Sequence, residues 1–233
     1  MFSGYFRNIT ALTCQSRIRT PIAIMTTLSE ISLTTVLDLV GTFAFAISGI
    51  RLASGKNIDW FGAFIVGLAT AIGGGTTRDL LLGVTPFWML NAMYVITTGV
   101  ALVLAILFRG NLLKWGSTLF LFDAIGLGLF TIVGISKSLD AGLSVWVCIM
   151  MGAITGSVGG VLRDVLINEV PLIFRKDIYA LACIVGGIVY FICHRFQFST
   201  PVCELVAAST VIVIRIIAVR FHIQLPLLNS INP

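Results

Sequence analysis

Residues 67–79 read GLATAIGGGTTRD and residues 152–164 read GAITGSVGGVLRD, so one stretch of the chain occurs twice, 85 positions apart. The same offset aligns further residues on both sides of it without a gap: Asp38 with Asp123, Gly41 with Gly126, Phe45 with Phe130, Gly49 with Gly134, Pro86 with Pro171 and Tyr94 with Tyr179. A shared glycine-rich, apolar composition would explain the aligned glycines but not the aligned Asp, Arg-Asp and Pro residues. The sequence therefore contains two copies of one unit.

The composition is that of a protein whose solvent is lipid. Apolar residues make up 58% of the 233 residues and charged residues only 11%, and the mean hydropathy is +1.04, whereas soluble domains contain about 25% charged residues. Apolar runs fill most positions after Ile31 and leave no room for a soluble catalytic domain. The basic residues behind the net charge of +5 are scattered singly at the ends of these runs, so they indicate membrane topology rather than binding of nucleic acid.

Crossing the hydrocarbon of a bilayer takes about 20 mostly apolar residues. Seven segments meet this requirement: 32–50, 60–82, 91–108, 117–136, 143–167, 178–194 and 202–219. We predict an all-α membrane protein of seven transmembrane helices, three in each unit. Since three is odd, the second unit must insert upside down, which is the inverted-repeat architecture of transport proteins. The predicted parts are an N-terminal extension (1–30), repeat 1 (31–112), repeat 2 (113–196), a seventh helix (197–222) and a C-terminal tail (223–233).

Lysines and arginines in the loops predict the orientation, because they are retained on the cytoplasmic side. One side would hold more of them than the other: Arg51, Lys56, Arg109, Lys114, Arg175, Lys176 and Arg220, against Lys137 and Arg195. We therefore expect a multi-pass protein of the cell's inner (plasma) membrane with its N-terminus outside and its C-terminus in the cytoplasm.

The N-terminal extension lacks the pattern of the rest. Its arginines at 7, 17 and 19 argue weakly against the predicted orientation, and Met25 offers an alternative start just before the first span. We expect the extension to be flexible or to precede the true start. Without a sustained apolar core and a small-residue cleavage site, it does not resemble a cleaved signal peptide.

The glycines of the duplicated stretch suggest a functional path. At 3.6 residues per turn, Gly67, Thr70, Gly74 and Arg78 share one stripe of a helix. Successive glycines weaken a helix by about 1 kcal/mol each and uncover its carbonyls, so a kink or a broken helix is expected. The pattern fits either close helix packing or a hydrated route whose carbonyls and hydroxyls replace a cation's water. The route would use Gly73, Gly74, Gly75, Gly159, Gly160, Thr70, Thr155 and Ser157.

Charged residues at membrane depth are expensive unless they pair or line a polar cavity. Six of them occur in matched positions: Asp38, Arg78, Asp79, Asp123, Arg163 and Asp164. Because neighbours on a helix point about 100° apart, we expect each arginine to pair with an aspartate of another helix rather than with the next residue. Such pairs would either brace the fold or gate a pore.

Other chemistry has little support in the sequence. The five cysteines (14, 148, 183, 193 and 203) lack metal-type spacing, and His194 and His222 are isolated, so neither a metal site nor a cofactor is expected. The triple glycine follows helical rather than strand periodicity, which excludes a phosphate loop, and the chain contains no catalytic motif. We do not expect an enzyme.

The duplicated Gly-Gly-x-x-Arg-Asp motif, with Asp-x-x-Gly opening both units at 38 and 123, resembles the prokaryotic trimeric intracellular cation (TRIC) channels. That family overlaps a bacterial glycine-transporter-domain family. The resemblance covers about residues 31–220 and implies a homotrimer in membrane lipid. It also implies one ion path per subunit, between kinked second and fifth helices, with potassium as the permeant ion. The second unit departs from the pattern, since Val158 stands where the first has Gly73, which puts strict symmetry of the path in doubt.

Two other functions stay open. A carrier of glycine or another small zwitterion would also use inverted repeats, with arginine and aspartate binding the two charges of its substrate. A membrane scaffold is the third alternative, although a scaffold does not need paired intramembrane charges.

Overall fold

The structure is a computed structural model that describes residues 33–108, 118–175 and 178–223. Every regular element among these residues is helical. In chain order the elements are α2 (Leu33–Ala53), α3 (Trp60–Leu81), α4 (Phe87–Leu90), α5 (Met93–Leu107), α7 (Thr118–Asp140), α8 (Val145–Leu166), the 3₁₀ helix η2 (Leu172–Phe174), α9 (Ala180–Arg195) and α10 (Thr200–Arg220). The predicted N-terminal extension, and the predicted C-terminal tail apart from Ile223, lie outside the described residues.

Five helices are long and apolar enough to cross a membrane: α2, α3, α7, α8 and α10. The apolar helices α5 and α9 are shorter, with 15 and 16 residues. All seven coincide with predicted spans. The largest difference is at the end of α7, which continues to Asp140 instead of ending near residue 136. Lysine is a good helix former, so the helix continues through Lys137, whose charge lies 3.6 Å from Asp38 of α2. The protein is a multi-pass helical membrane protein.

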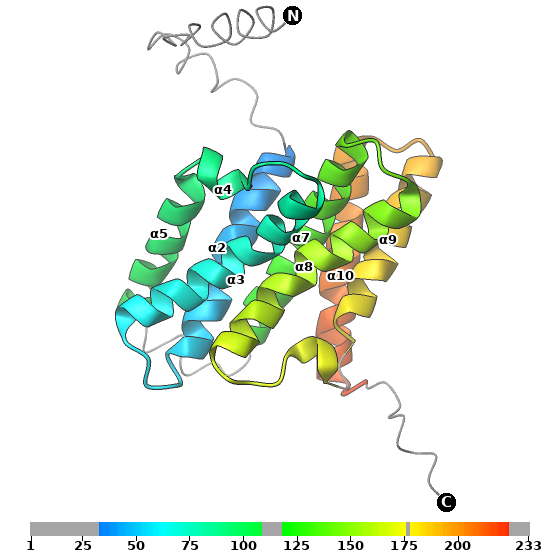
Figure 1. Ribbon diagram of the computed structural model, residues 1–233. Helices are drawn as coiled ribbons and strands as arrows, with labels where there is room; N and C mark the ends of the chain where they lie inside the picture. Colours follow the sequence, from blue (N-terminus) through cyan, green and yellow to red (C-terminus); the bar gives the residue numbers. More distant parts are fainter. Residues whose placement is uncertain (1–32, 109–117, 176–177, 224–233) are drawn as a thin grey trace, which may run out of the picture. The chain divides into compact units, whose positions relative to one another are not determined.

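The long helices run between two ends of the molecule (Figure 1). We call the end where α2 begins and α3 and α7 end the upper end. The opposite one, where α2, α8 and α10 end, is the lower end. Equivalent helices of the two units run in opposite directions, since α2 descends where α7 ascends and α3 ascends where α8 descends.

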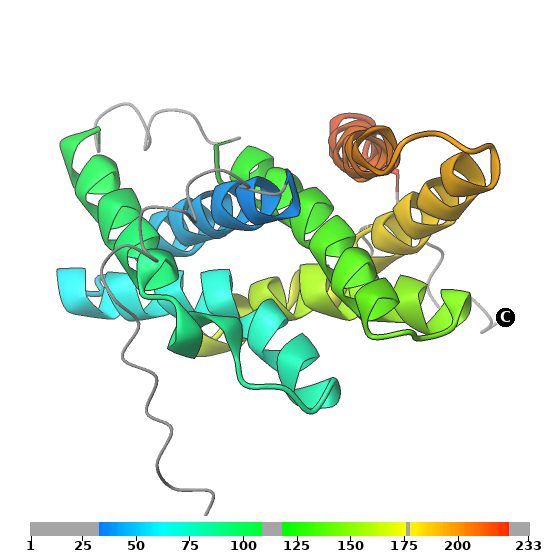
Figure 2. The same ribbon diagram turned by 90° about the horizontal axis from the view of Figure 1, so that it is seen from above.

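Four helices form the centre of the molecule. Helix α2 packs on α3 and α7, and α8 packs on the same two helices. Helix α5 covers α2 and α3, whereas α9 and α10 lie beside α7 and α8 on the opposite flank (Figure 2). The second unit therefore has α10 as an additional neighbour.

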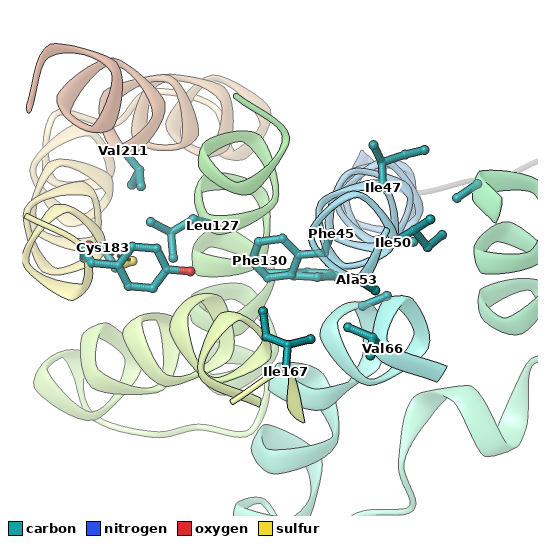
Figure 3. Packing of buried hydrophobic residues seen from close by; sticks show 14 of the residues in the cluster. Phe45, Ile47, Ile50, Ala53, Val66, Leu127, Phe130, Ile167, Cys183 and Val211 are labelled. Atoms are coloured by element: carbon teal, nitrogen blue, oxygen red, sulfur yellow. Dashed lines mark hydrogen bonds between the residues drawn. The ribbon is translucent and has the colours of Figure 1, made fainter. Parts of the chain in front are cut away.

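Equivalent phenylalanines form the contact between α2 and α7. The rings of Phe45 and Phe130 meet edge to face with their centres 5.2 Å apart, and Figure 3 shows both between the two helices. The ring of Phe45 occupies the space that a side chain at Gly126 would need, and the ring of Phe130 would be in tight contact with a side chain at Gly41. Glycine at these positions lets α2 and α7 approach closely, as small residues do in membrane bundles.

Candidate functional site

Equivalent glycines meet where α3 crosses α8. A side chain at Gly74 would collide with the backbone carbonyl oxygen of Thr155, and one at Gly159 would collide with the carbonyl oxygen of Thr70. We call this line of backbone contact the seam. Because only a hydrogen occupies the side-chain position of glycine, the helices can touch there without displacing either backbone.

The other predicted glycines are also buried in close contacts. Gly73 lies against the side chain of Leu162, Gly75 against the ring of Phe87, and Gly160 against the hydroxyl of Tyr179. In this structure the glycines allow close helix packing, which was one of the two roles predicted from the sequence. Their other predicted role, in a route for ions, stays a prediction.

Of the two alternatives expected for the second and fifth helices, a kink or a break, the break is wrong. Helix α3 continues without interruption through residues 73–75, and α8 continues through Gly159 and Gly160. The glycines lower helix propensity, but tertiary packing on both sides of the seam outweighs that local cost. The hydroxyls of Thr76 and Thr77 also donate to carbonyls one turn back. A kink within the unbroken helices stays a prediction.

The three predicted hydroxyl residues bond within their own helices. Thr70 Oγ1 donates to the carbonyl of Val66 and Thr155 Oγ1 to that of Met151, each over 2.6 Å. Ser157 Oγ donates to the carbonyl of Ala153 over 2.6 Å. Their protons are therefore used locally, while the oxygen lone pairs stay available as acceptors.

At the lower end, Arg163 is the centre of a buried cluster. Its Nε donates to Asp164 Oδ1 (2.8 Å). Its Nη1 donates to Asp123 Oδ1 of α7 (2.5 Å) and to Ser48 Oγ of α2 (2.7 Å). The Tyr179 hydroxyl donates to the same Asp123 oxygen over 3.4 Å. With 1% of its side chain exposed, Arg163 has its charge neutralised by carboxylates rather than by water.

At the upper end, the equivalent Arg78 is less well satisfied. It is fully buried, and its Nε donates to Asp79 Oδ1 over 2.8 Å. Asp38, the counterpart of Asp123, instead accepts a hydrogen bond from Tyr94 (3.0 Å) and pairs with Lys137. Arg78 Nη1 and Asp38 Oδ1 have no hydrogen-bond partner among the described residues. One sequence difference contributes, because the residue equivalent to Ser48 is Val133, which has no hydroxyl.

The expectation that each arginine pairs with an aspartate of another helix rather than with the next residue is confirmed only in part, by Arg163 and Asp123. Both arginines bond to the aspartate that follows them. The three methylenes of arginine are long enough to bring the guanidinium across the angle between neighbouring positions. Of these two arginines, only Arg163 also reaches an aspartate of another helix within 4.0 Å in the described part of the chain, namely Asp123 of α7.

The two aspartates have a second, equivalent role. Asp79 Oδ2 accepts the backbone N–H of Phe87 (2.8 Å), and Asp164 Oδ2 accepts that of Leu172 (3.0 Å). Each acceptor lies eight residues before its donor, and each donor follows the aligned proline. In both units the charged pair therefore holds the returning chain against the end of its helix.

Sequence reasoning missed five buried or half-buried partners in these clusters: Ser48, Lys137, Arg215, and Tyr94 and Tyr179 in their bonding role. The signal for Arg215 was present, since a single arginine within an apolar run is a functional candidate by default. It also missed Glu204 of α10, a buried carboxylate that accepts from Thr34 Oγ1 over 3.1 Å.

Outside the seam, a cavity of about 510 Å³ opens at the upper end. Its polar lining comes from Asp79, Thr85, Lys137 and Asp140, and Phe87 forms part of its wall. The Phe87 ring also lies 5.3 Å from Lys137 Nζ and 5.5 Å from the guanidinium carbon of Arg78. Phe87 and Asp79 thus both line the cavity and contact the buried guanidinium.

At the lower end an exposed ion pair joins the two units. Lys56 Nζ, in the loop before α3, donates to Glu169 Oε1, after α8, over 2.5 Å. This hydrogen bond and the charge of Lys56 lower the pKa of the Glu169 carboxyl below its ordinary value of 4.5. Within the described ranges, acidic, histidine and cysteine side chains form no group suited to a metal ion.

The sequence model of one family, described as Glycine transporter, matches this chain twice, over residues 35–110 and 120–195. The two matches start 85 positions apart, like the aligned residues of the two units. The UPF0126 inner membrane protein YadS of Escherichia coli (strain K12) is 40% identical over 196 residues, which cover 82% of this chain and 93% of that protein.

Solved structures of cation channels share the fold. A TRIC cation channel, solved to explain conductance, is 36% identical with a TM-score of 0.75 over 84% of this chain and 97% of its own. The TRIC channel orthologue from Rhodobacter sphaeroides is 31% identical with a TM-score of 0.77, over 82% of this chain and 98% of its own. The chain therefore belongs to the family described as Glycine transporter and, with these solved relatives, to the prokaryotic TRIC channels.

Proposed function

We propose that this protein is a channel that conducts monovalent cations, above all potassium, along a path between α3 and α8 of each subunit. The observation that carries the proposal is its likeness to TRIC cation channels over nearly their whole length. The equivalent charged clusters at the two ends of the seam add support, because intramembrane charges mark ion pathways.

The proposed architecture has seven membrane crossings in two inverted repeats. The doubled family match and the opposite directions of equivalent helices support it. Helices α5 and α9 would complete their crossings together with the short α4 and η2 that precede them. The subunits would form a homotrimer, as the name of the related channels states, in the inner membrane with the N-terminus outside. The upper end then faces outward and the lower end faces the cytoplasm.

In this structure the seam is closed, because Gly74 and Gly159 leave no room for an ion between the helices. Conduction requires α3 and α8 to separate there. Separation would expose the carbonyls of Thr70 and Thr155, and carbonyl oxygens can replace the hydration shell of potassium. The arginines would not repel the ion strongly as long as the aspartates neutralise them.

The second candidate is transport of glycine or a similar zwitterion. Two observations favour it: the family's description, and the buried Arg78 and Asp38, each with an unpartnered atom that could hold a carboxylate or an ammonium group.

Reconstitution separates the two functions. The purified protein is incorporated into planar bilayers for potassium currents and into liposomes for uptake of labelled glycine. Discrete current steps carried by potassium are expected, with no glycine uptake above that of empty liposomes. Saturable glycine uptake without current steps would overturn the channel proposal in favour of the carrier.

A further inference from the structure

Arg215 joins α10 to the lower cluster, although α10 belongs to neither repeat. Its Nη1 donates to the backbone carbonyl of Ile178 over 2.7 Å. Its guanidinium carbon lies 4.8 Å from the ring centre of Tyr179 and 5.0 Å from that of Phe120. Its Nη2 is 4.0 Å from Asp123 Oδ2. With 1% of the side chain exposed, Arg215 is buried in contact with both rings, and its Nε has no hydrogen-bond partner among the described residues.

These contacts reach the seam through Tyr179. Because Arg215 binds the carbonyl of the preceding residue and covers the ring, it fixes both the backbone and the side chain of Tyr179. The Tyr179 hydroxyl in turn lies against Gly160 of α8, the residue after Gly159 of the seam, and donates to Asp123, which holds Arg163. Displacing Arg215 would therefore loosen the groups that close the lower end.

Among the residues that the structure describes, the upper end has no equivalent of this arrangement. Its aspartate, Asp38, is approached by Lys137, whose side chain is 33% exposed and lines the upper cavity. A lysine is a flexible point charge, whereas a planar arginine stacked on rings is fixed in one orientation. The upper and lower clusters thus match in their Asp, Tyr and Arg residues but differ in the additional cation near the aspartate. At the upper end this cation is Lys137 of α7, and at the lower end it is Arg215 of α10.

We propose that Arg215 is a positioning residue that acts as a latch and keeps the lower half of the ion path closed. Because the latch comes from α10, which lies outside the repeats, the two ends of a nearly two-fold symmetric path open unequally. The inference rests on the proposed channel function. It assigns the seventh helix a part in gating in addition to packing. The latch opens when the guanidinium leaves the carbonyl of Ile178 and the ring of Tyr179.

Single-channel recording in potassium tests the latch. Arg215→Gln removes the charge and the stacking, and Arg220→Gln is the matched control, because Arg220 is an exposed basic residue at the end of the same helix. We expect Arg215→Gln to raise the open probability about 5-fold or more, the lower limit of ordinary coupling between sites, without changing the unitary conductance. Arg215→Lys should restore part of the closure. An open probability equal to that of wild type in Arg215→Gln would overturn the latch.

A second readout does not depend on conduction. The thiol of Cys183 is buried and donates to the carbonyl of Tyr179 over 3.8 Å. In protein whose other four cysteines are serine, we expect a cationic methanethiosulfonate reagent to label Cys183 about 5-fold faster or more after Arg215→Gln. Should Arg215→Gln fail to fold, Tyr179→Phe replaces it with the same expected direction. Faster labelling in protein without any current would support the latch and reject the channel. Unchanged labelling and gating in a conducting protein would reject the latch alone.

Discussion

Gly74 of α3 lies directly against the backbone carbonyl of Thr155 in α8, and the contact is reproduced when both positions are exchanged for their repeat equivalents, Gly159 and Thr70. The seam thus consists of two equivalent contacts, one from each repeat. In both copies, glycine is required because the neighbouring backbone occupies the space of a β-carbon.

Adding one methyl group to the seam should destabilise the protein. Gly74→Ala and Gly159→Ala each force a β-carbon onto a carbonyl oxygen, and overpacking of this kind costs about 1–3 kcal/mol. The melting temperature of each purified variant in detergent should therefore fall.

Gly99→Ala is the matched control for the seam variants. A β-carbon at Gly99 of α5 would meet no atom within 4 Å, and alanine improves helix propensity by up to about 1 kcal/mol. Its melting temperature should stay the same or rise. Equal losses in all three variants would mean that the seam is not tightly packed.

The two equivalent arginines should differ in their contribution to stability. Arg163→Ala leaves Asp123 buried without its closest cation, which costs about 3–5 kcal/mol when an ion pair is broken in this way. Arg78→Ala removes fewer bonds, since Arg78 bonds only Asp79 among the described residues, and Asp38 keeps Lys137 and Tyr94. Thermal unfolding in detergent should rank Arg163→Ala as the less stable variant, and the reverse order would contradict the hydrogen-bonding pattern described above.

Currents of the same variants separate bracing from gating. If Arg78 gates the upper half of the path, Arg78→Ala that folds and assembles should change the open probability for potassium, because the field around Asp38 changes. The exposed Arg220→Ala should leave the currents as in wild type. Wild-type currents from well-folded Arg78→Ala would restrict this residue to a structural role.

The Lys56 and Glu169 pair should contribute stability that depends on pH. Because Lys56 lowers the pKa of Glu169 in the folded protein, the contribution is present above the ordinary pKa of a glutamate. It is lost as the pH falls through the lowered value. The melting temperature of Lys56→Gln should therefore lie slightly below that of wild type at neutral pH, and the difference should vanish in acid. A difference that persists at acid pH would have another cause.

Much of this protein was determined by the sequence alone. The hydrophobic runs place the spanning helices, because a helix is the simplest structure that satisfies its own backbone in lipid. The 85-residue offset shows the duplicated unit, and the position of Asp38, Arg78 and their equivalents within apolar runs marks the charged residues. These properties are local or periodic along the chain, so they can be read without knowing which helices touch.

Tertiary structure decided which partners those residues have. The glycines were compatible with a broken helix until α3 and α8 were seen to pack on them, and packing outweighs propensity. Arg78 and Arg163 occupy equivalent sequence positions, yet their partners differ. Arg163 donates hydrogen bonds to Ser48 and Asp123, whereas none joins Arg78 to the equivalent residues, Val133 and Asp38, in the described part of the chain. Arg215 joins the lower cluster from a helix outside the repeat. Such contacts join residues that are far apart in the chain, and the energy of a buried charge depends on the few ångströms around it, which only the folded arrangement of helices fixes.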